Sequence, residues 1–91
     1  MLELKQTSQF KKDLRRMVKR GANMELLDEV IMMLRERKTL PAKYEDHPLT
    51  GNWAGYRDCH IQPDWLLIYR IDDDALILIA TRTGTHSEIF K

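Results

Sequence analysis

Two stretches of the chain repeat apolar residues with the spacing of a helix that buries one face. In residues 7–20 the apolar positions follow an i, i+4, i+7, i+8 pattern: Phe10, Leu14, Met17 and Val18. Thr7 or Ser8 can cap the start, and Gly21 suits the end. Asn23 can cap a second helix over 24–38, whose apolar stripe is Leu26, Leu27, Val30, Ile31 and Leu34. Because few residues separate the two segments, they are predicted to form an antiparallel hairpin.

Strand-like segments surround this hairpin. Residues 2–5 alternate apolar and polar positions, and 56–62, 64–72 and 75–82 read as strands, with Asp72–Asp74 as the last turn. Residues 39–55 hold two prolines and two glycines and are predicted to be a long, functional loop. The order β-α-α-β-β-β predicts an α+β domain, with the hairpin packed on one face of an antiparallel sheet and a short turn or helix at the C-terminus. The other face, or the rim, is expected to stay open.

Length and composition agree with one soluble domain over residues 1–91. Hydrophobic residues make up 43% and charged residues 32% of the chain. No apolar run approaches the roughly 20 residues that span a bilayer, and the N-terminus lacks the layout of a signal peptide. Cys59 is the single cysteine, which excludes an internal disulfide. A cytoplasmic protein without a membrane partner is expected.

Net charge is only +1, but its distribution is uneven. Residues 1–23 hold seven Lys or Arg against two acidic residues, whereas residues 24–91 hold eight against twelve. The helix at 11–20 would therefore attract a polyanion, chiefly through Lys11, Lys12 and Arg15. A solvated helix face is the competing interpretation.

Titratable side chains gather near the ends of the predicted strands. Strand alternation places Asp58 and His60 on one face, expected to be the less buried, and Cys59 on the other as a small core residue. If strand 64–72 is central, Asp64 and His60 meet Arg82 and His86 at one edge of the sheet. His47 can join them from the long loop.

These residue types suit chemistry at phosphorus. Histidine exchanges protons near neutrality, and arginine offers a planar fork to phosphate oxygens. In RNA the 2′-hydroxyl can itself be the nucleophile, so neither a metal nor a cofactor is required. Trp65 and Phe90 could stack on unpaired bases, although Trp65 equally suits a core. A zinc site is disfavoured because the close spacings of zinc motifs are missing.

Two segments, "YEDHPLTGNWAGYRDCHIQPDWLLIYRI" and "TRTGTHSEIF", closely resemble the YafQ branch of the RelE/ParE toxin superfamily. The resemblance covers residues 44–90 and implies a RelE-like fold. It also implies a ribosome-dependent mRNA endoribonuclease of a type II toxin–antitoxin system, acting in the ribosomal A site without a metal. The implied partners are a cognate antitoxin, mRNA and the 16S rRNA of the A site. The complex with the antitoxin would bind operator DNA.

The family's functional positions match residues of this chain. The matching residues are His47, His60, Asp64, His86 and Phe90, with Asp58, Trp65 and Arg82 also in the motif. The roles that we assign are hypotheses. His60 and His86 are base and acid in either order, and Asp64 orients a histidine or acts as base. Arg82 holds the scissile phosphate, and His47 contacts the mRNA backbone or assists proton transfer. Asp58, Trp65 and Phe90 contact the substrate.

Two other functions remain open on the same fold. A ParE-like toxin would bind and inhibit DNA gyrase without cutting nucleic acid, and an interaction module would use its polar edge only for an antitoxin. Neither needs a set of His, Asp and Arg side chains, and a fold by itself does not settle function.

Overall fold

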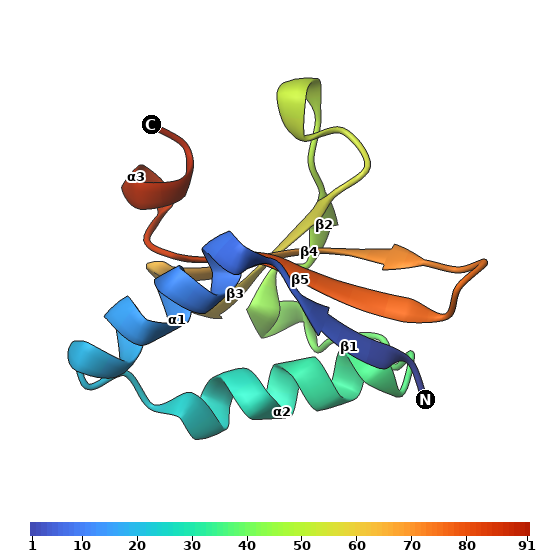
Figure 1. The fold of residues 1–91 in the computed structure, drawn as a ribbon, viewed down its shortest axis with the longest axis horizontal. Helices are drawn as coiled ribbons and strands as arrows, with labels where there is room; N and C mark the ends of the chain where they lie inside the picture. Colours follow the sequence, from blue (N-terminus) through green and yellow to red (C-terminus); the bar gives the residue numbers. More distant parts are fainter.

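The computed structural model describes residues 1–91, which form one five-stranded sheet with helices on both sides (Figure 1). The strands are β1 (Glu3–Gln6), β2 (His47–Pro48), β3 (Arg57–Gln62), β4 (Trp65–Asp72) and β5 (Ile77–Gly84). Their order across the sheet is β1-β5-β4-β3-β2. The last three predicted strands pair in chain order with 64–72 in the middle, as assumed from the sequence, and form the antiparallel meander β3-β4-β5.

The two long helices begin at the capping residues that the sequence indicates. In α1 (Ser8–Lys19) the Thr7 hydroxyl accepts from the Phe10 amide, and in α2 (Met24–Arg35) the Asn23 side chain accepts from the Glu25 amide. Each bond satisfies an amide that the helix itself leaves free. A third helix, α3 (His86–Ile89), ends the chain, and two short 3₁₀ turns, η1 (Ala42–Tyr44) and η2 (Gly51–Trp53), flank β2.

The larger core lies between the helical hairpin and one face of the sheet. Phe10 and Val30 from the helices pack with Leu67, Tyr69 and Leu78 from the strands, and each is at most 1% exposed. The predicted α1 stripe is wrong at one position, because Val18 is 54% exposed. It lines an open groove between α1 and α2, together with Leu14 and Met32.

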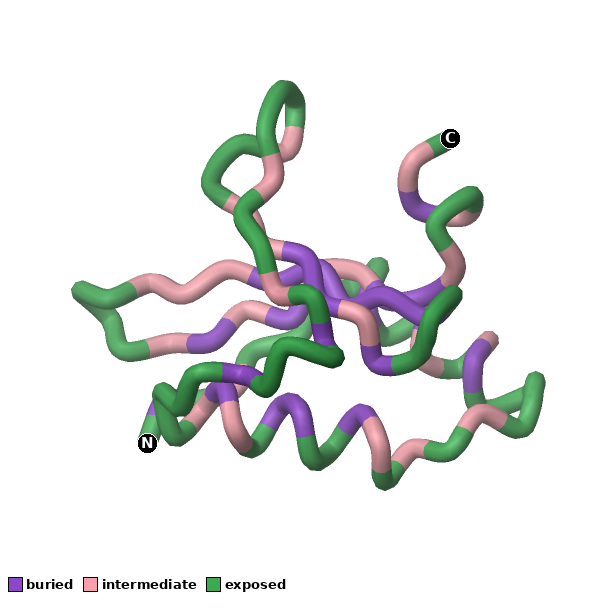
Figure 2. The backbone as a smooth tube through the Cα atoms, turned by 180° about the vertical axis from the view of Figure 1, so that it is seen from behind, coloured by how far each residue is buried: buried purple, intermediate pink, exposed green.

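A smaller apolar cluster occupies the opposite face of the sheet. Leu66 and Ile68 of β4 pack with Ile89 of α3, and Leu49, Trp53, Tyr56 and Phe90 surround them. In Figure 1 the segment between β2 and β3 and the C-terminal α3 both rise from this face, away from α2. Figure 2 shows burial concentrated in the central strands, while the tip of that segment is exposed. The face expected to be open is therefore partly covered.

Three details of the prediction around the sheet are wrong. The sheet is mixed, because β1 runs parallel to β5, which the intervening hairpin makes possible. Residues 39–55 are not a plain loop, since they contain β2 and both 3₁₀ turns. The last strand also starts later than predicted, after Leu76 adopts a positive φ of 56° in the turn. None of the helices has the length and apolar character that crossing a bilayer requires.

Candidate functional site

The polar residues of the site lie in neighbouring rows across one face of the sheet. The strand register aligns His47, Asp58, Ile68 and Arg82, one from each strand from β2 to β5. The next row along β3 starts at His60, which pairs with Leu66, which in turn pairs with Gly84. Directly paired residues of antiparallel strands point to the same face, and neighbouring strands lie about 4.8 Å apart. The register thus gathers these side chains over β3, β4 and the end of β5.

Asp58 lies at the centre of this group and is buried. Its residue is 4% exposed, and its Oδ1 has no hydrogen-bond partner. Burial raises the pKa of Asp58 above its usual value, against the attraction of His60, His47 and His86. Little of Asp58 is therefore accessible in this structure, and the substrate contact that the sequence suggests for it stays a prediction. The carboxylate faces the histidines.

His47 is held from two sides. Its Nδ1 lies 2.6 Å from the carbonyl oxygen of Glu45, and its Nε2 lies 3.7 Å from Oδ2 of Asp58. Because a carbonyl only accepts, Nδ1 carries the proton of that hydrogen bond. The side chain is nevertheless 48% exposed, so its outer edge is accessible.

The backbone next to His47 is fixed by a buried polar contact. The Asp46 carboxylate accepts a hydrogen bond from the Tyr69 hydroxyl at 2.6 Å and two from Arg57 at 3.3 Å. These bonds attach the start of β2 to β3 and β4.

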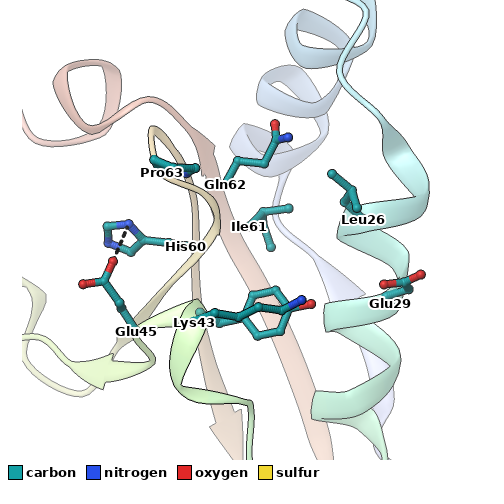
Figure 3. Close-up of a pocket in the computed structure, with 9 residues that line it drawn as sticks. Leu26, Glu29, Lys43, Glu45, His60, Ile61, Gln62 and Pro63 are labelled. Carbon is teal, nitrogen blue, oxygen red and sulfur yellow. Dashed lines mark ion pairs between the residues drawn. The ribbon is translucent and has the colours of Figure 1, made fainter.

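His60 lies beside a carboxylate at the edge of the sheet. Its Nδ1 is 3.5 Å from Oε2 of Glu45, and Figure 3 shows the two side chains pointing toward each other. His60 also lines an open pocket of about 520 Å³. The pocket continues past Lys43 and Gln62 to Leu26 of α2. This edge is free because β2 has only two residues and leaves the end of β3 unpaired.

His86 begins α3 on the far side of the site. Its backbone amide lies 3.4 Å from Oδ1 of Asp64, so the predicted approach of these residues is present, although through the backbone. The exposed His86 ring stacks obliquely on Phe90, with centroids 4.9 Å apart. Phe90 contacts Trp53 edge to face, and Trp53 contacts Tyr56. This half-buried aromatic group adjoins the histidines and offers apolar surface beside them.

Arg82 is bound by an acidic residue of α1. Its Nε donates to Oδ2 of Asp13 at 2.7 Å and its Nη2 donates to Oδ1 at 3.3 Å. Burial by itself would raise the pKa of Asp13, but hydrogen bonds led by Arg82 hold it below its usual value. Arg82 was expected to bind a phosphate with two guanidinium nitrogens, but two of these nitrogens already bind the Asp13 carboxylate. Nη1 has no protein partner among the hydrogen bonds of the structure.

Two residues on the other face belong to the core. Trp65 is 2% exposed, and its Nε1 donates to the Thr83 hydroxyl at 2.9 Å. Trp65 therefore packs as a core residue, the alternative that its sequence context equally allowed, and its contact with substrate stays a prediction. Cys59 is buried, as expected, and burial raises the pKa of its thiol.

Only some of the basic side chains of α1 are free to attract a polyanion. Arg16 and Arg20 pair with Glu88, whereas Lys11, Lys12, Arg15 and Lys19 are exposed and make no ion pair. No three His, Cys, Asp or Glu side chains are arranged to hold a metal ion.

Several residues of the site escaped the sequence interpretation. Trp53 and Tyr56 complete the aromatic group, Asp13 binds Arg82, and Glu88 anchors α3. A signal existed for Glu88, because Thr85-x-x-Glu88 is a capping box, and the structure contains both of its bonds. Nothing in the sequence near Asp13 indicates Arg82, which lies 69 residues away.

Comparison with known proteins places this geometry in a family. The family model described as the bacterial toxin of a type II toxin–antitoxin system, YafQ, matches residues 2–91. The mRNA interferase toxin YafQ of Escherichia coli (strain K12) is 40% identical over 89 residues, covering 97% of this chain and 95% of that protein.

Solved structures agree with the sequence matches. A metal-bound toxin from Helicobacter pylori superposes with a TM-score of 0.94 at 41% identity, covering 99% of this chain and 100% of its own. A chain of the E. coli DinJ-YafQ complex gives a TM-score of 0.89 at 40% identity, with both chains covered completely. The chain therefore belongs to the YafQ family of bacterial toxins from type II toxin–antitoxin systems, with the RelE-like fold.

Proposed function

We propose that this protein is an mRNA endoribonuclease that cuts the codon in the ribosomal A site. One observation carries the proposal: His47 lies 3.7 Å from the buried carboxylate of Asp58, and His60 and His86, from two other segments on the same partly accessible face, also favour its charged form. The E. coli relative is named an mRNA interferase, which supports the same reaction here. A protein that only bound gyrase or an antitoxin would not need three histidines around a costly buried acid.

The reaction is a transesterification in which the 2′ oxygen displaces the 5′ oxygen from phosphorus. A histidine takes the proton of the 2′-hydroxyl, the 2′ oxygen bonds to phosphorus, and the bond from phosphorus to the 5′ oxygen breaks. A second histidine protonates that leaving oxygen, giving a 2′,3′-cyclic phosphate and a 5′-hydroxyl. Each proton transfer is worth roughly 10²–10⁴ in rate.

The contacts suggest a division of roles. His60 and His86 lie on opposite sides of the site and are the base and acid, in either order. The Glu45 carbonyl holds the His47 ring through Nδ1 while the side chain stays 48% exposed, so His47 suits contact with the RNA backbone. Asp64 supports the first turn of α3 beside His86. Arg82 reaches the phosphate with Nη1 while Asp13 holds its other nitrogens, and Phe90 supports a base.

Partners follow from the same proposal. The site is open and shallow, so the ribosome, with its 16S rRNA, would present the mRNA in a reactive alignment. This activity belongs in the cytoplasm. A cognate antitoxin would neutralise the toxin, as the DinJ-YafQ complex suggests, and the pair would bind operator DNA.

The test uses ribosomes programmed with a defined mRNA and maps new 5′ ends. We expect cuts within the A-site codon that persist in EDTA and fall by at least about 10²-fold in His86→Ala. Asp74→Asn, an exposed substitution in the β4–β5 turn, is the control and should cleave like the wild type.

Each other outcome separates the alternatives. Intact mRNA together with blocked gyrase supercoiling would identify a ParE-like inhibitor, and neither effect would leave an interaction module. Cleavage abolished by EDTA would reject the metal-free mechanism. This control matters because a related toxin has been crystallised with a metal.

A further inference from the structure

An alternating series of charges joins α1 to the strand and helix that end the chain. Asp13, Arg16 and Arg20 lie on one face of α1, three and four residues apart. Asp13 binds Arg82 on one side and Arg16 Nη2, at 3.0 Å, on the other. Arg16 Nε lies 3.0 Å from Glu88 Oε2, and Arg20 donates to both Glu88 oxygens at 2.9 and 2.6 Å. We call this series, Arg82–Asp13–Arg16–Glu88–Arg20, the ionic ladder.

Glu88 is the most highly coordinated member of the ladder. Besides the two arginines, its Oε1 accepts from the amide and the hydroxyl of Thr85, each at 3.0 Å. The hydrogen bond from Arg20 holds the pKa of Glu88 far below its usual range, despite partial burial. One carboxylate thus caps α3 and ties it to a helix 68 residues away in sequence.

α3 depends on this attachment because it has only four residues. A single helical turn is not stable by itself in water. Ile89 attaches one side of the turn to Leu66 and Ile68, and Glu88 attaches the other side to α1. Without Glu88, only the apolar contacts of Ile89 and Phe90 and the long bond from the His86 amide to Asp64 would hold the turn, so it could rotate and carry the His86 and Phe90 side chains with it.

The backbone that leads into α3 passes close to two side chains of the ionic ladder. Gly84, the last residue of β5, has φ of +147°, in the region that favours glycine. A Cβ placed there would lie 3.1 Å from Glu88 Oε1 and 3.5 Å from Arg16 Nη2. The close approach leaves little freedom to the carboxylate, and so to the segment from Gly84 to His86.

We infer that Glu88 is a positioning residue: through the ionic ladder it fixes where α3 holds His86 and Phe90 relative to the scissile phosphate. This inference rests on the proposed nuclease function. Glu88 need not touch RNA, because its oxygens are already occupied. Nor is overall stability its main contribution, since the Arg16 and Arg20 side chains are 39% and 45% exposed and such ion pairs stabilise folded proteins little. A displacement of about 1 Å, by contrast, can cost a catalyst about 100-fold in rate.

The test compares Glu88→Gln and Arg20→Gln with two controls, Glu25→Gln and Lys19→Gln. The controls remove the same charges from exposed side chains that make no ion pair. In the ribosome assay we expect each ladder variant to lower kcat by about 10- to 100-fold, with KM within about twofold of wild type. The double variant should be little worse than either single variant, because both remove one interaction.

A second readout does not depend on nuclease activity. The Phe90 amide donates to the His86 carbonyl at 2.9 Å, so its hydrogen exchange reports whether the α3 turn is formed. We expect exchange to accelerate at least about tenfold in both ladder variants and in neither control, with Tm nearly unchanged.

The outcomes distinguish the two proposals. The positioning role would be overturned if the ladder variants kept the wild-type kcat and if their Phe90 amide exchanged as slowly as in the wild type. The role would also be overturned if the ladder variants raised KM without lowering kcat and Lys19→Gln raised KM equally. That result would mean only a weaker attraction of RNA. Wild-type protein that leaves mRNA intact would refute the nuclease instead, while the exchange data would still decide whether Glu88 fixes α3.

Discussion

Asp58 shows how one residue can sacrifice stability at a functional site. Its carboxylate is buried, one oxygen is unpartnered, and the other lies 3.7 Å from Nε2 of His47. A buried charge without full pairing is costly. The histidines compensate only partly, because the pKa of Asp58 remains raised.

Replacing Asp58 by Asn should therefore stabilise the protein at neutral pH. A raised pKa means that the folded state binds the proton more tightly, so this contribution to stability is present below the usual pKa and lost as pH rises through the folded pKa. Asp58→Asn should then raise the free energy of unfolding at pH 7.5, and less so at pH 4.5. Urea denaturation at both pH values measures the difference.

The same variant should lose activity while it gains stability. Without the charge that faces the histidines, mRNA cleavage should fall on the order of tenfold, the scale seen when a group that orients a functional histidine is removed. Asp74→Asn is the matched control, with no change expected in either quantity. Lower stability of Asp58→Asn at pH 7.5 would contradict this account.

At the scale of elements, β4 illustrates how alternation sorts residues between two cores. Trp65, Leu67 and Tyr69 point toward the helical hairpin, whereas Leu66 and Ile68 point toward α3. The run is buried throughout, so the apolar pattern alone could not say which side carries the site. Only the packing of α3 and of the segment before β3 does so.

Trp65→Phe tests this assignment. The change removes a buried indole donor and leaves the Thr83 hydroxyl without it, which should cost about 1–3 kcal/mol in the free energy of unfolding. The rate of mRNA cleavage on ribosomes, divided by the folded fraction that the denaturation curves give, should be unchanged. Trp53→Phe, in the half-buried aromatic group, should cost less stability. Unchanged stability with weakened RNA binding in Trp65→Phe would restore a stacking role.

The prediction of elements succeeded where local signals were strong. Thr7 and Asn23 indicated both long helices, and Asp72–Asp74 indicated the last turn. The two-residue β2 was missed because so short a strand has no periodicity, and only its pairing of His47 with Asp58 defines it. Strand β1 was predicted, but its parallel pairing with β5 was not, because pairing direction depends on distant connections.

At the scale of the whole molecule, charge is separated although the net charge is +1. The exposed basic residues of α1 lie toward one end, and the acidic β4–β5 turn lies at the other (Figure 1). A ribosome presents a dense array of phosphates, so an orienting effect of this separation is expected.

Removing the charges of Lys11, Lys12 and Arg15 together, by substitution with Gln, should weaken binding to programmed ribosomes most at low salt. The slope of log K against log salt should fall by about 0.7–0.9 for each phosphate that these side chains no longer neutralise. A triple Gln variant of Lys5, Lys38 and Lys91 removes as much charge from other parts of the chain and serves as the control. Equally weakened binding in both variants would mean that only net charge matters.

The sequence by itself determined the two long helices, every strand but β2, and the set of candidate histidines. Capping, turns and periodicity act over a few residues, and a motif that fixes many residue types can be recognised from the sequence alone. Tertiary structure decided which of those side chains are accessible. Asp58 and Trp65 carry the same motif signal as His60, yet the first is covered by a neighbouring segment and the second lies in the core. Asp13 and Arg82, or Arg20 and Glu88, meet across about 70 residues, because burial and pairing are set by what the fold brings alongside, and no local pattern encodes that.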